Sequence, residues 1–265
     1  MFYFLLFIMP KPLTSEQIDS MKAAGKLCGQ TLSMLKQYIK PGITTMEINN
    51  VAEEFILSNN ATPTFKGYNK FHFALCISID DCVIHGVPNN KPLIEGQIVS
   101  IDCGVTLNGW IGDSAYTYPV GEISNDKKQL MKITEEALYL GIKEAKNGNK
   151  TYDIAKVIQT YCEAAGYSLT RELTGHGVGK KLHQEPPVPN FVPPLIKRHI
   201  LPNAKLFNGL AIAIEPMVHF GGKEIYLDEN DKWSIITKDH SVAAHYEHTV
   251  IINNDEPIIT TLVED

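Results

Sequence analysis

The chain has 265 residues, of which 44% are hydrophobic and 20% charged, so it can bury the core of one large domain or two small ones. Its formal net charge of −6, without any run of Lys and Arg, argues against nucleic acid or an anionic membrane as a partner. The five cysteines, Cys28, Cys76, Cys82, Cys103 and Cys162, lack a paired CxxC spacing. This favours reduced thiols in a cytoplasmic protein over a disulfide framework.

The chain begins with an almost wholly apolar stretch from Met1 to Met9. This stretch is too short to span a bilayer, and it has neither a cationic start nor a small-residue cleavage site, so it does not match a targeting signal. Met9 opens a polar stretch that leads into the first predicted helix. We interpret residues 1–13 as an N-terminal extension, either a real tail or an upstream start-site error, and residues 14–265 as a single domain.

Two helices followed by short strands are predicted for the first half. Thr14 and Gln17 form a capping box, and apolar residues then recur every three or four positions until Pro41-Gly42. Thr44 and Glu47 repeat this signal for a second helix that ends near residues 59–60. Apolar runs at about residues 73–79, 83–87, 98–106 and 110–118 then predict strands of an antiparallel meander.

The second half repeats this order. Helices are predicted from about Asn125 and from Thr151, separated by a break at Gly148, and strands near residues 210–219, 233–238 and 242–252. The proline-rich stretch 184–204 predicts an ordered but irregular loop over one rim. The repeat indicates an α+β fold of two pseudo-symmetric helix-helix-antiparallel-sheet halves, with helices outside and carboxylates between the sheets.

The Asn108-Gly109 pair is the strongest hairpin signal in the chain and predicts a two-residue type I′ turn. In that register Asp102 lies opposite Ala115, and Asp113 lies two positions from Ala115 on the same face. Diagonal neighbours of this kind have Cβ atoms roughly 7–8 Å apart, within reach of a shared metal ion. Because Asp is depleted in strand interiors, the two acids are interpreted as metal ligands.

Three further residues have settings that suit metal ligands. Glu215 ends an apolar run, Glu247 lies inside one, and a carboxylate buried in this way needs a cation as its partner. His176 lies in a glycine-rich turn, residues 175–179, that lets the backbone approach a ligand closely. Four carboxylates with one imidazole suit two divalent ions, and manganese, iron, cobalt and zinc all remain open. The predicted ligands are Asp102, Asp113, His176, Glu215 and Glu247.

This predicted centre indicates a hydrolase. His85 and His183 lie in glycine- or proline-flanked settings, where an unligated imidazole could bind the scissile carbonyl or give a proton to the leaving amine. Lys180 follows the glycine-rich turn, but the Walker spacing and its Ser or Thr are missing. The sequence also has no GxSxG or HExxH motif and no cysteine in a recognisable nucleophile context.

Taken in order, these motifs resemble those of the type I methionine aminopeptidases from about Thr14 to Ile252. The resemblance implies the pita-bread fold with internal pseudo-twofold symmetry. It also implies a role for each ligand, with Asp102 on one metal, His176 and Glu215 on the other, and Asp113 and Glu247 bridging. The matching segments are Ile77-Ser78-Ile79 through His85-Gly86-Val87-Pro88, Asp102 with Asp113, Gly175-His176-Gly177-Val178-Gly179, Glu215-Pro216-Met217 and Tyr246-Glu247-His248-Thr249.

The resemblance further implies that the protein removes the initiator methionine from nascent polypeptides with a small second residue. A metal-bridging water or hydroxide would attack the peptide carbonyl, with Glu215 handling its proton, His183 steadying the carbonyl oxygen and His85 contacting the scissile amide nitrogen. Aromatic rings and sulfur suit a polarizable thioether. The implied methionine pocket consists of Phe65, Tyr68, Phe71, Cys76 and Trp233.

The sequence departs from the family at Gln184, where Glu is usual, and at Phe65 and Phe71, where Cys and Tyr are common. Two other functions stay open, because fold alone does not fix function: a proline-specific peptidase of the same fold, and a non-catalytic binding protein that keeps the fold. We expect a cytoplasmic monomer whose partners are the N-terminal segments of nascent polypeptides. The ribosome is a candidate partner, and no nucleic acid or membrane is expected.

Overall fold

The computed structural model describes residues 9–254 and 256–263. Met1 to Ile8, the larger part of the predicted extension, lie outside these residues, so both interpretations of the extension stay open. Each half begins with a pair of helices: α1 (Ser15–Leu35) with α2 (Thr45–Ser58), and α3 (Asn125–Lys143) with α4 (Thr151–Ala164). None of the helices in the described residues has the length and apolarity that crossing a membrane requires.

Helices α1 and α2 begin at the predicted capping boxes. The Thr14 hydroxyl accepts a hydrogen bond from the Gln17 amide at 3.4 Å, while the Gln17 side chain accepts one from the Thr14 amide at 3.1 Å. Thr44 and Glu47 make the same exchange at 3.1 and 2.8 Å. These bonds satisfy amides that the first helical turn leaves free. The predicted starts of both helices are confirmed.

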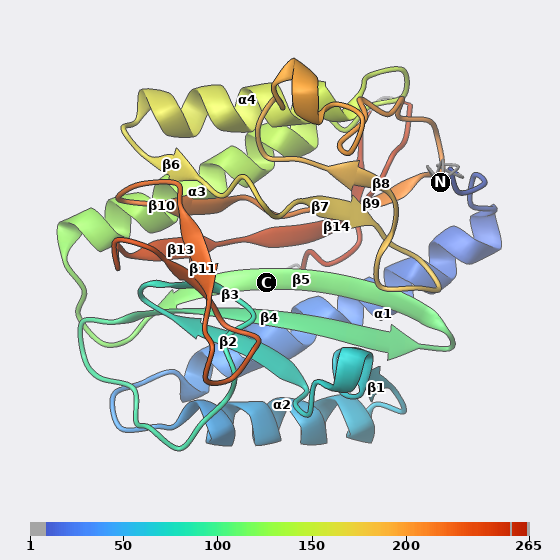
Figure 1. Ribbon diagram of the computed structural model, residues 1–265. Coiled ribbons are helices and arrows are strands. Elements are labelled where there is room, and N and C mark those ends of the chain that lie inside the picture. Colours follow the sequence, from blue (N-terminus) through green and yellow to red (C-terminus); the bar gives the residue numbers. More distant parts are fainter. Residues whose placement is uncertain (1–8, 255, 264–265) are drawn as a thin grey trace.

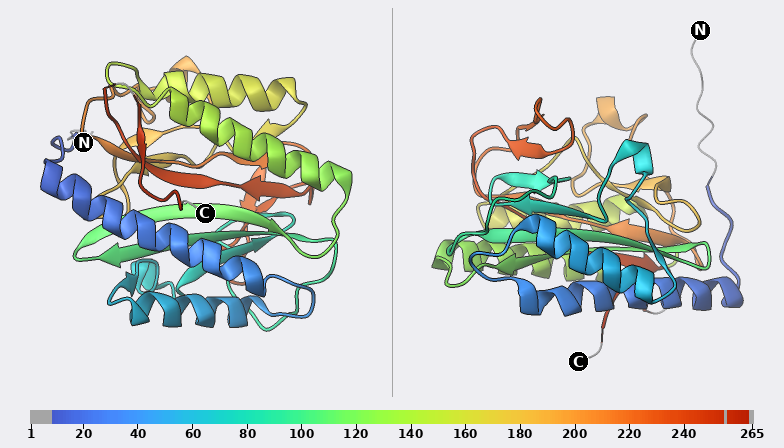
Figure 2. Two further views of the ribbon diagram at one scale, coloured as in Figure 1. Left: turned by 180° about the vertical axis from the view of Figure 1, so that it is seen from behind. Right: turned by 90° about the horizontal axis from the view of Figure 1, so that it is seen from below.

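A nine-stranded sheet runs through both halves, in the order β1-β4-β5-β14-β9-β7-β8, with β2 paired to β4 and β15 to β14. The helices cover one face of this sheet, and smaller sheets lie on the other, as the two views of Figure 2 show. The strands of the main sheet are β1 (Thr62–Pro63), β2 (Leu75–Ile79), β4 (Ile98–Leu107), β5 (Trp110–Pro119), β7 (Gly175–Gly177), β8 (Gln184–Val188), β9 (Ala211–Ile214), β14 (Glu247–Ile251) and β15 (Ile258–Ile259).

The halves therefore share one sheet, and the expectation of carboxylates between two sheets is wrong. Strands β5 and β14 pair at the junction between the two halves, the seam, which lies in the centre of Figure 1. Each half keeps its own hydrophobic core between its helices and the sheet, with Leu32, Ile48 and Ile101 in the first and Leu138, Ile158 and Ile212 in the second. This arrangement accounts for the pseudo-symmetry, because each helix pair covers its own half of a common sheet.

The hairpin between β4 and β5 has the predicted register. Leu107 pairs with Trp110 and Asp102 with Ala115. Asn108 and Gly109 have φ angles of 51° and 77°, as a type I′ turn requires at both central positions. The prediction of this register is confirmed.

Three predicted strand arrangements differ from the structure. Strand β3 (Cys82–Ile84) leaves the predicted meander and pairs with β12 (Ile235–Thr237), which also pairs with β11 (Ile225–Leu227). After β3 the chain returns close to β2: the Ile77 amide donates to the Gly86 carbonyl at 2.8 Å, and a Cβ at Gly86 would clash with the Ile77 carbonyl oxygen.

The predicted strands 210–219 and 242–252 are each broken in two. The first divides into β9 and β10 (Met217–His219) around Pro216, which has no amide proton for the ladder. The second divides at Tyr246 into β13 (Ala243–His245) and β14. Strands β10 and β13 form a separate sheet with β6 (Ser168–Leu169). The first segment thus passes from the main sheet into the smaller one, and the second passes from the smaller sheet into the main one.

The proline-rich stretch 184–204 is not irregular throughout. It begins with β8, which forms the edge of the main sheet and pairs with β7. An edge strand tolerates Pro186 and Pro187 because one row of its backbone groups needs no partner in the sheet. The rest of the stretch is irregular apart from a 3₁₀ turn at Leu195–Lys197.

Candidate metal centre

The predicted ligands lie on the face of the main sheet that is turned away from the helices. Asp102 on β4 and Glu247 on β14 both pair with Ala115 of the intervening strand β5. Asp113 lies two positions from Ala115 on the same face, because successive side chains in a strand alternate. The short side chain of Ala115 therefore leaves space among the three carboxylates.

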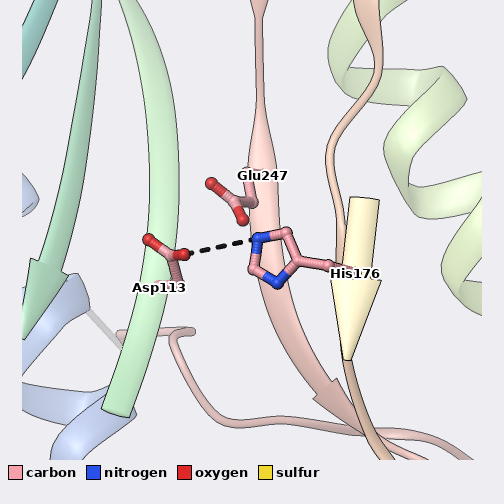
Figure 3. Close-up of side chains that lie close together, drawn as sticks. All are labelled: Asp113, His176 and Glu247. Carbon is pink, nitrogen blue, oxygen red and sulfur yellow. Dashed lines mark ion pairs between the residues drawn. The ribbon is translucent and has the colours of Figure 1, made fainter. Parts of the chain in front are cut away.

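Ligand atoms of Asp113, His176 and Glu247 all lie within 4.8 Å of one another. Figure 3 shows the three side chains pointing toward a common point from β5, β7 and β14. The His176 Nε2 is 3.7 Å from Oδ2 of Asp113 and 3.5 Å from Oε1 of Glu215, the residue that follows β9. Elements from both halves of the chain thus deliver this cluster.

The tautomer of His176 is set by its own turn. Its Nδ1 lies 3.0 Å from the Gly177 carbonyl oxygen, which can only accept a hydrogen bond. Nδ1 therefore carries the proton, and the lone pair of Nε2 faces the carboxylates. Burial lowers the pKa of His176 to about 3, so the ring is neutral near pH 7. A neutral imidazole with one fixed N–H is the form that binds a metal ion.

The carboxylates are crowded and withdrawn from solvent. Asp113 and Glu247 are 3% and 2% exposed, and Asp102 Oδ1, Asp113 Oδ1 and Glu247 Oε1 are buried without a hydrogen-bond partner in the part of the chain that the structure describes. Burial raises the pKa of Asp113 to about 7. Burial and neighbouring negative charges raise the pKa values of Asp102, Glu215 and Glu247 well above their usual range.

These observations fit a divalent cation site. A cluster of buried acids with unpaired oxygens is costly unless a cation compensates its charge. No Lys or Arg is among the described residues that line the cavity around the cluster. Oxygen donors together with one imidazole suit borderline and hard divalent ions. The donor set therefore fits a divalent cation, and the ligand roles and the number of ions stay predictions.

A cavity of about 220 Å³ opens onto this cluster. Its walls include every site residue expected from the sequence: the five ligands, His85, His183, Phe65, Tyr68, Phe71, Cys76 and Trp233. They also include Asn69, Ile84 and Leu182, which no sequence motif singled out. Ile84 and Leu182 directly precede His85 and His183, so proximity was their only signal, because an apolar residue does not stand out among core residues.

The aromatic residues in the cavity wall pack against one another. The Phe71 and Trp233 rings meet edge to face, with centroids 4.9 Å apart. Phe65 fits because Gly104 has no side chain, and a Cβ there would lie 2.7 Å from Cε1 of the Phe65 ring. The presence of Phe65 is thus coupled to a glycine on the neighbouring strand β4.

His85 and His183 also line the cavity, and His183 lies between Tyr68 and the predicted ligand His176. The Tyr68 hydroxyl is 2.7 Å from His183 Nδ1, and the ring centroids of His183 and His176 are 4.4 Å apart. His85 has a positive φ of 59°, an uncommon conformation for a residue with a side chain. Burial lowers the pKa of His85 to about 4. Both rings can therefore act as neutral hydrogen-bonding groups beside a bound molecule.

Comparisons with known proteins agree with this architecture. Residues 19–254 match the model of metallopeptidase family M24. A methionine aminopeptidase of Clostridium perfringens is 46% identical over 94% of this chain and 97% of its own length. The crystal structure of methionine aminopeptidase from Rickettsia prowazekii superposes with a TM-score of 0.91 at 37% identity, covering 96% of this chain and all of that one.

A more distant structure shares the fold alone. Prolidase from Pyrococcus furiosus has a TM-score of 0.76 at 21% identity, and the match covers 96% of this chain but 66% of the prolidase chain. The pita-bread fold expected from the sequence is confirmed by these neighbours.

Proposed function

The chain belongs to metallopeptidase family M24, and from this premise we propose that it is a metalloaminopeptidase that removes the N-terminal methionine of polypeptides. The observation that carries the proposal is a single cavity in which a buried carboxylate–imidazole cluster adjoins a pocket of aromatic rings and sulfur. Such a pocket suits a thioether side chain.

We infer that the cluster holds two divalent cations. Asp102 would ligate one, His176 and Glu215 the other, and Asp113 and Glu247 would bridge them. Manganese, iron, cobalt and zinc all suit these donors. When bound, such ions supply a nucleophilic water at neutral pH and polarise the scissile carbonyl.

The side chains around the cluster have separate tasks in this proposal. Glu215 accepts the proton of the attacking water and passes it toward the leaving amine. The Tyr68 hydroxyl lies 2.7 Å from His183 Nδ1, and when this hydroxyl is the donor, the Nε2–H of His183 is free to donate to the carbonyl oxygen. His85 contacts the scissile amide nitrogen. Phe65, Tyr68, Phe71, Cys76 and Trp233 hold the methionine side chain.

The setting of this activity is also part of the proposal. The enzyme would act in the cytoplasm as a monomer on the N-terminal segments of nascent polypeptides whose second residue is small. The ribosome is the candidate partner that would bring these segments to it. Co-sedimentation of the protein with translating ribosomes tests this last point separately from the chemistry.

Peptide cleavage with and without a chelator tests the reaction. Met-Gly and Xaa-Pro peptides are incubated with metal-free protein and with protein reconstituted with each candidate ion, and Asp113→Asn serves as the matched control. We expect methionine release from Met-Gly peptides only when metal is present. Proline-dependent cleavage would instead identify a proline-specific peptidase. Absence of cleavage with any ion would identify a non-catalytic protein of this fold.

A further inference from the structure

Strands β5 and β14 are joined at the seam by an unusual ladder. The register pairs Glu247 with Ala115 and His248 with Ser114. Beyond these two pairs, a threonine hydroxyl forms the hydrogen bonds that a main-chain amide and carbonyl would form in a regular ladder. Thr249 Oγ1 accepts from the Asp113 amide at 3.0 Å and donates to the Asp113 carbonyl at 2.8 Å.

The same arrangement of hydrogen bonds occurs on the other side of the pair formed by Glu247 and Ala115. Thr117 Oγ1 accepts from the His245 amide at 3.1 Å and donates to the His245 carbonyl at 2.7 Å. Two positions to one side of the pair, Asp113 is held by Thr249, and two positions to the other side, His245 is held by Thr117. The backbone of His245 is thus fixed in the same way as that of a proposed metal ligand.

His245 also faces the site. It is 1% exposed, and its Nε2 is buried without a hydrogen-bond partner among the residues that the structure describes. That nitrogen lies 3.8 Å from Oε2 of Glu215. The other oxygen, Oε1, lies 3.5 Å from His176 Nε2, so the Glu215 carboxyl group is flanked by two imidazoles.

The main chain of Glu215 also has a buried hydrogen-bond partner. The Asn190 side chain, itself 1% exposed, donates to the Glu215 carbonyl at 2.9 Å. The main chain of Glu215 is therefore held in place, whereas its carboxylate needs a further contact to fix its orientation. A buried ring nitrogen without a partner is costly, and the nearby carboxylate oxygen is an acceptor that could satisfy it.

We propose that His245 is a positioning residue whose Nε2–H donates a hydrogen bond to Oε2 of Glu215. An N–H···O⁻ bond has a length of roughly 2.8 Å, so a shift of about 1 Å from the observed separation forms it. The bond directs Oε1 toward the centre and limits rotation of the carboxylate. Hydrogen bonds from outside the ligand set orient metal-binding carboxylates in this manner. The inference rests on the proposed role of Glu215.

Two substitutions of similar size separate the hydrogen bond from the space that the ring fills. His245→Gln keeps an N–H donor, whereas His245→Met has none. Titration calorimetry of the metal-free variants with Mn²⁺ gives the readout. We expect His245→Met to bind the ion about 10- to 100-fold more weakly than the wild type, and His245→Gln to stay within a few-fold. Equal affinity of the two variants overturns the proposal.

His219→Met is the matched control. His219 is buried in β10, the strand that pairs with β13, but its ring nitrogens contact Thr170 and the Gly222 carbonyl, away from the cluster. This variant is expected to lose stability and to bind Mn²⁺ as the wild type does. A similar loss of affinity in His219→Met would mean that removal of any imidazole from this small sheet weakens the centre, which also contradicts the proposal.

Two further measurements complete the test. With a Met-Gly peptide, His245→Met should lower kcat with little change in KM, since the residue acts through Glu215 and not on the methionine pocket. If this variant does not fold, ¹⁵N NMR of the wild-type imidazoles replaces it, and a His245 Nε2 that carries no proton refutes the bond. Wild-type protein that binds metal but releases no methionine would refute the proposed function while leaving the affinity comparison valid.

Discussion

In the metal-free protein, Asp113 is expected to make stability fall as the pH rises, the reverse of the usual behaviour of an acid. Burial raises its folded-state pKa to about 7, whereas an unfolded Asp titrates near 3.9. Below about pH 4 the residue is protonated in both states. Between about pH 4 and 7 the unfolded chain loses this proton and the folded protein keeps it, so ionisation favours unfolding.

The magnitude follows from the size of the shift. One pKa unit corresponds to about 1.4 kcal/mol, so a shift of about three units removes up to about 4 kcal/mol from the free energy of unfolding. His85, His176 and His245 have lowered pKa values of about 4, 3 and 3, and they act in the opposite direction within the same window. The comparison of the wild type with Asp113→Asn removes most of the contribution of His85 and His245, whereas His176 and the neighbouring acids interact with Asp113, so part of their contribution stays in the difference.

Urea unfolding of both proteins in the presence of a chelator, at pH values from 4 to 8, measures this difference. The stability of the wild type relative to Asp113→Asn should fall by up to about 4 kcal/mol between pH 4 and 7 and then level off. With saturating Mn²⁺ the trend should reverse, because the ion stabilises the ionised carboxylate. A metal-free difference that is flat, or that rises with pH, would show that the Asp113 carboxyl group is not desolvated as argued.

Three further substitutions probe other parts of the site. Glu247→Ala should keep the circular dichroism spectrum of the wild type and lose more than about 100-fold in methionine release, because it removes a proposed metal ligand and not merely an outer partner. Substantial activity with metal bound would contradict the proposed bridging role of Glu247. Gly104→Ala should raise KM for Met-Gly peptides more than it lowers kcat, since the new Cβ would meet Phe65 at 2.7 Å and push the ring into the pocket; an unchanged KM would place Phe65 outside the methionine subsite. Thr249→Val should cost about 2–4 kcal/mol in urea unfolding, because it leaves the Asp113 amide and carbonyl unpaired in a buried position, whereas Thr249→Ser should cost clearly less; equal losses would indicate that packing, and not the hydroxyl, matters there.

Features that depend on neighbouring residues were predicted well from the sequence. Both capping boxes and the β4–β5 hairpin involve residues at most a few positions from a turn or a helix start. Turn chemistry at Asn108-Gly109 determines which residue lies opposite Asp102. The placement of Asp102 and Asp113 on one face therefore follows from the amino-acid sequence alone, because side-chain alternation has a period of two.

Sheet membership was predicted poorly, because hydrophobic alternation does not specify a partner strand. The runs 210–219 and 242–252 read as single strands, yet each divides between two sheets. Pro216 gave a local signal for the first division, whereas Tyr246 gave none for the second. The sequence analysis also did not single out His245, because an imidazole among apolar residues looks like an ordinary core residue. Its main-chain hydrogen bond with the Thr117 hydroxyl joins residues 128 positions apart in the sequence.

The location of the centre follows from how the two halves share one sheet. A regular ladder between β5 and β14 would use main-chain groups throughout, but here hydroxyl groups replace them on both sides of Glu247. The residues opposite Asp113, Glu247 and His245 are Thr249, Ala115 and Thr117, which are all small. Short side chains on one strand thus lie opposite Asp113, Glu247 and His245 on the other, and two of them supply the hydroxyl groups that join the strands. The buried negative charges of the cluster destabilise the metal-free protein, and a bound cation would remove this destabilisation.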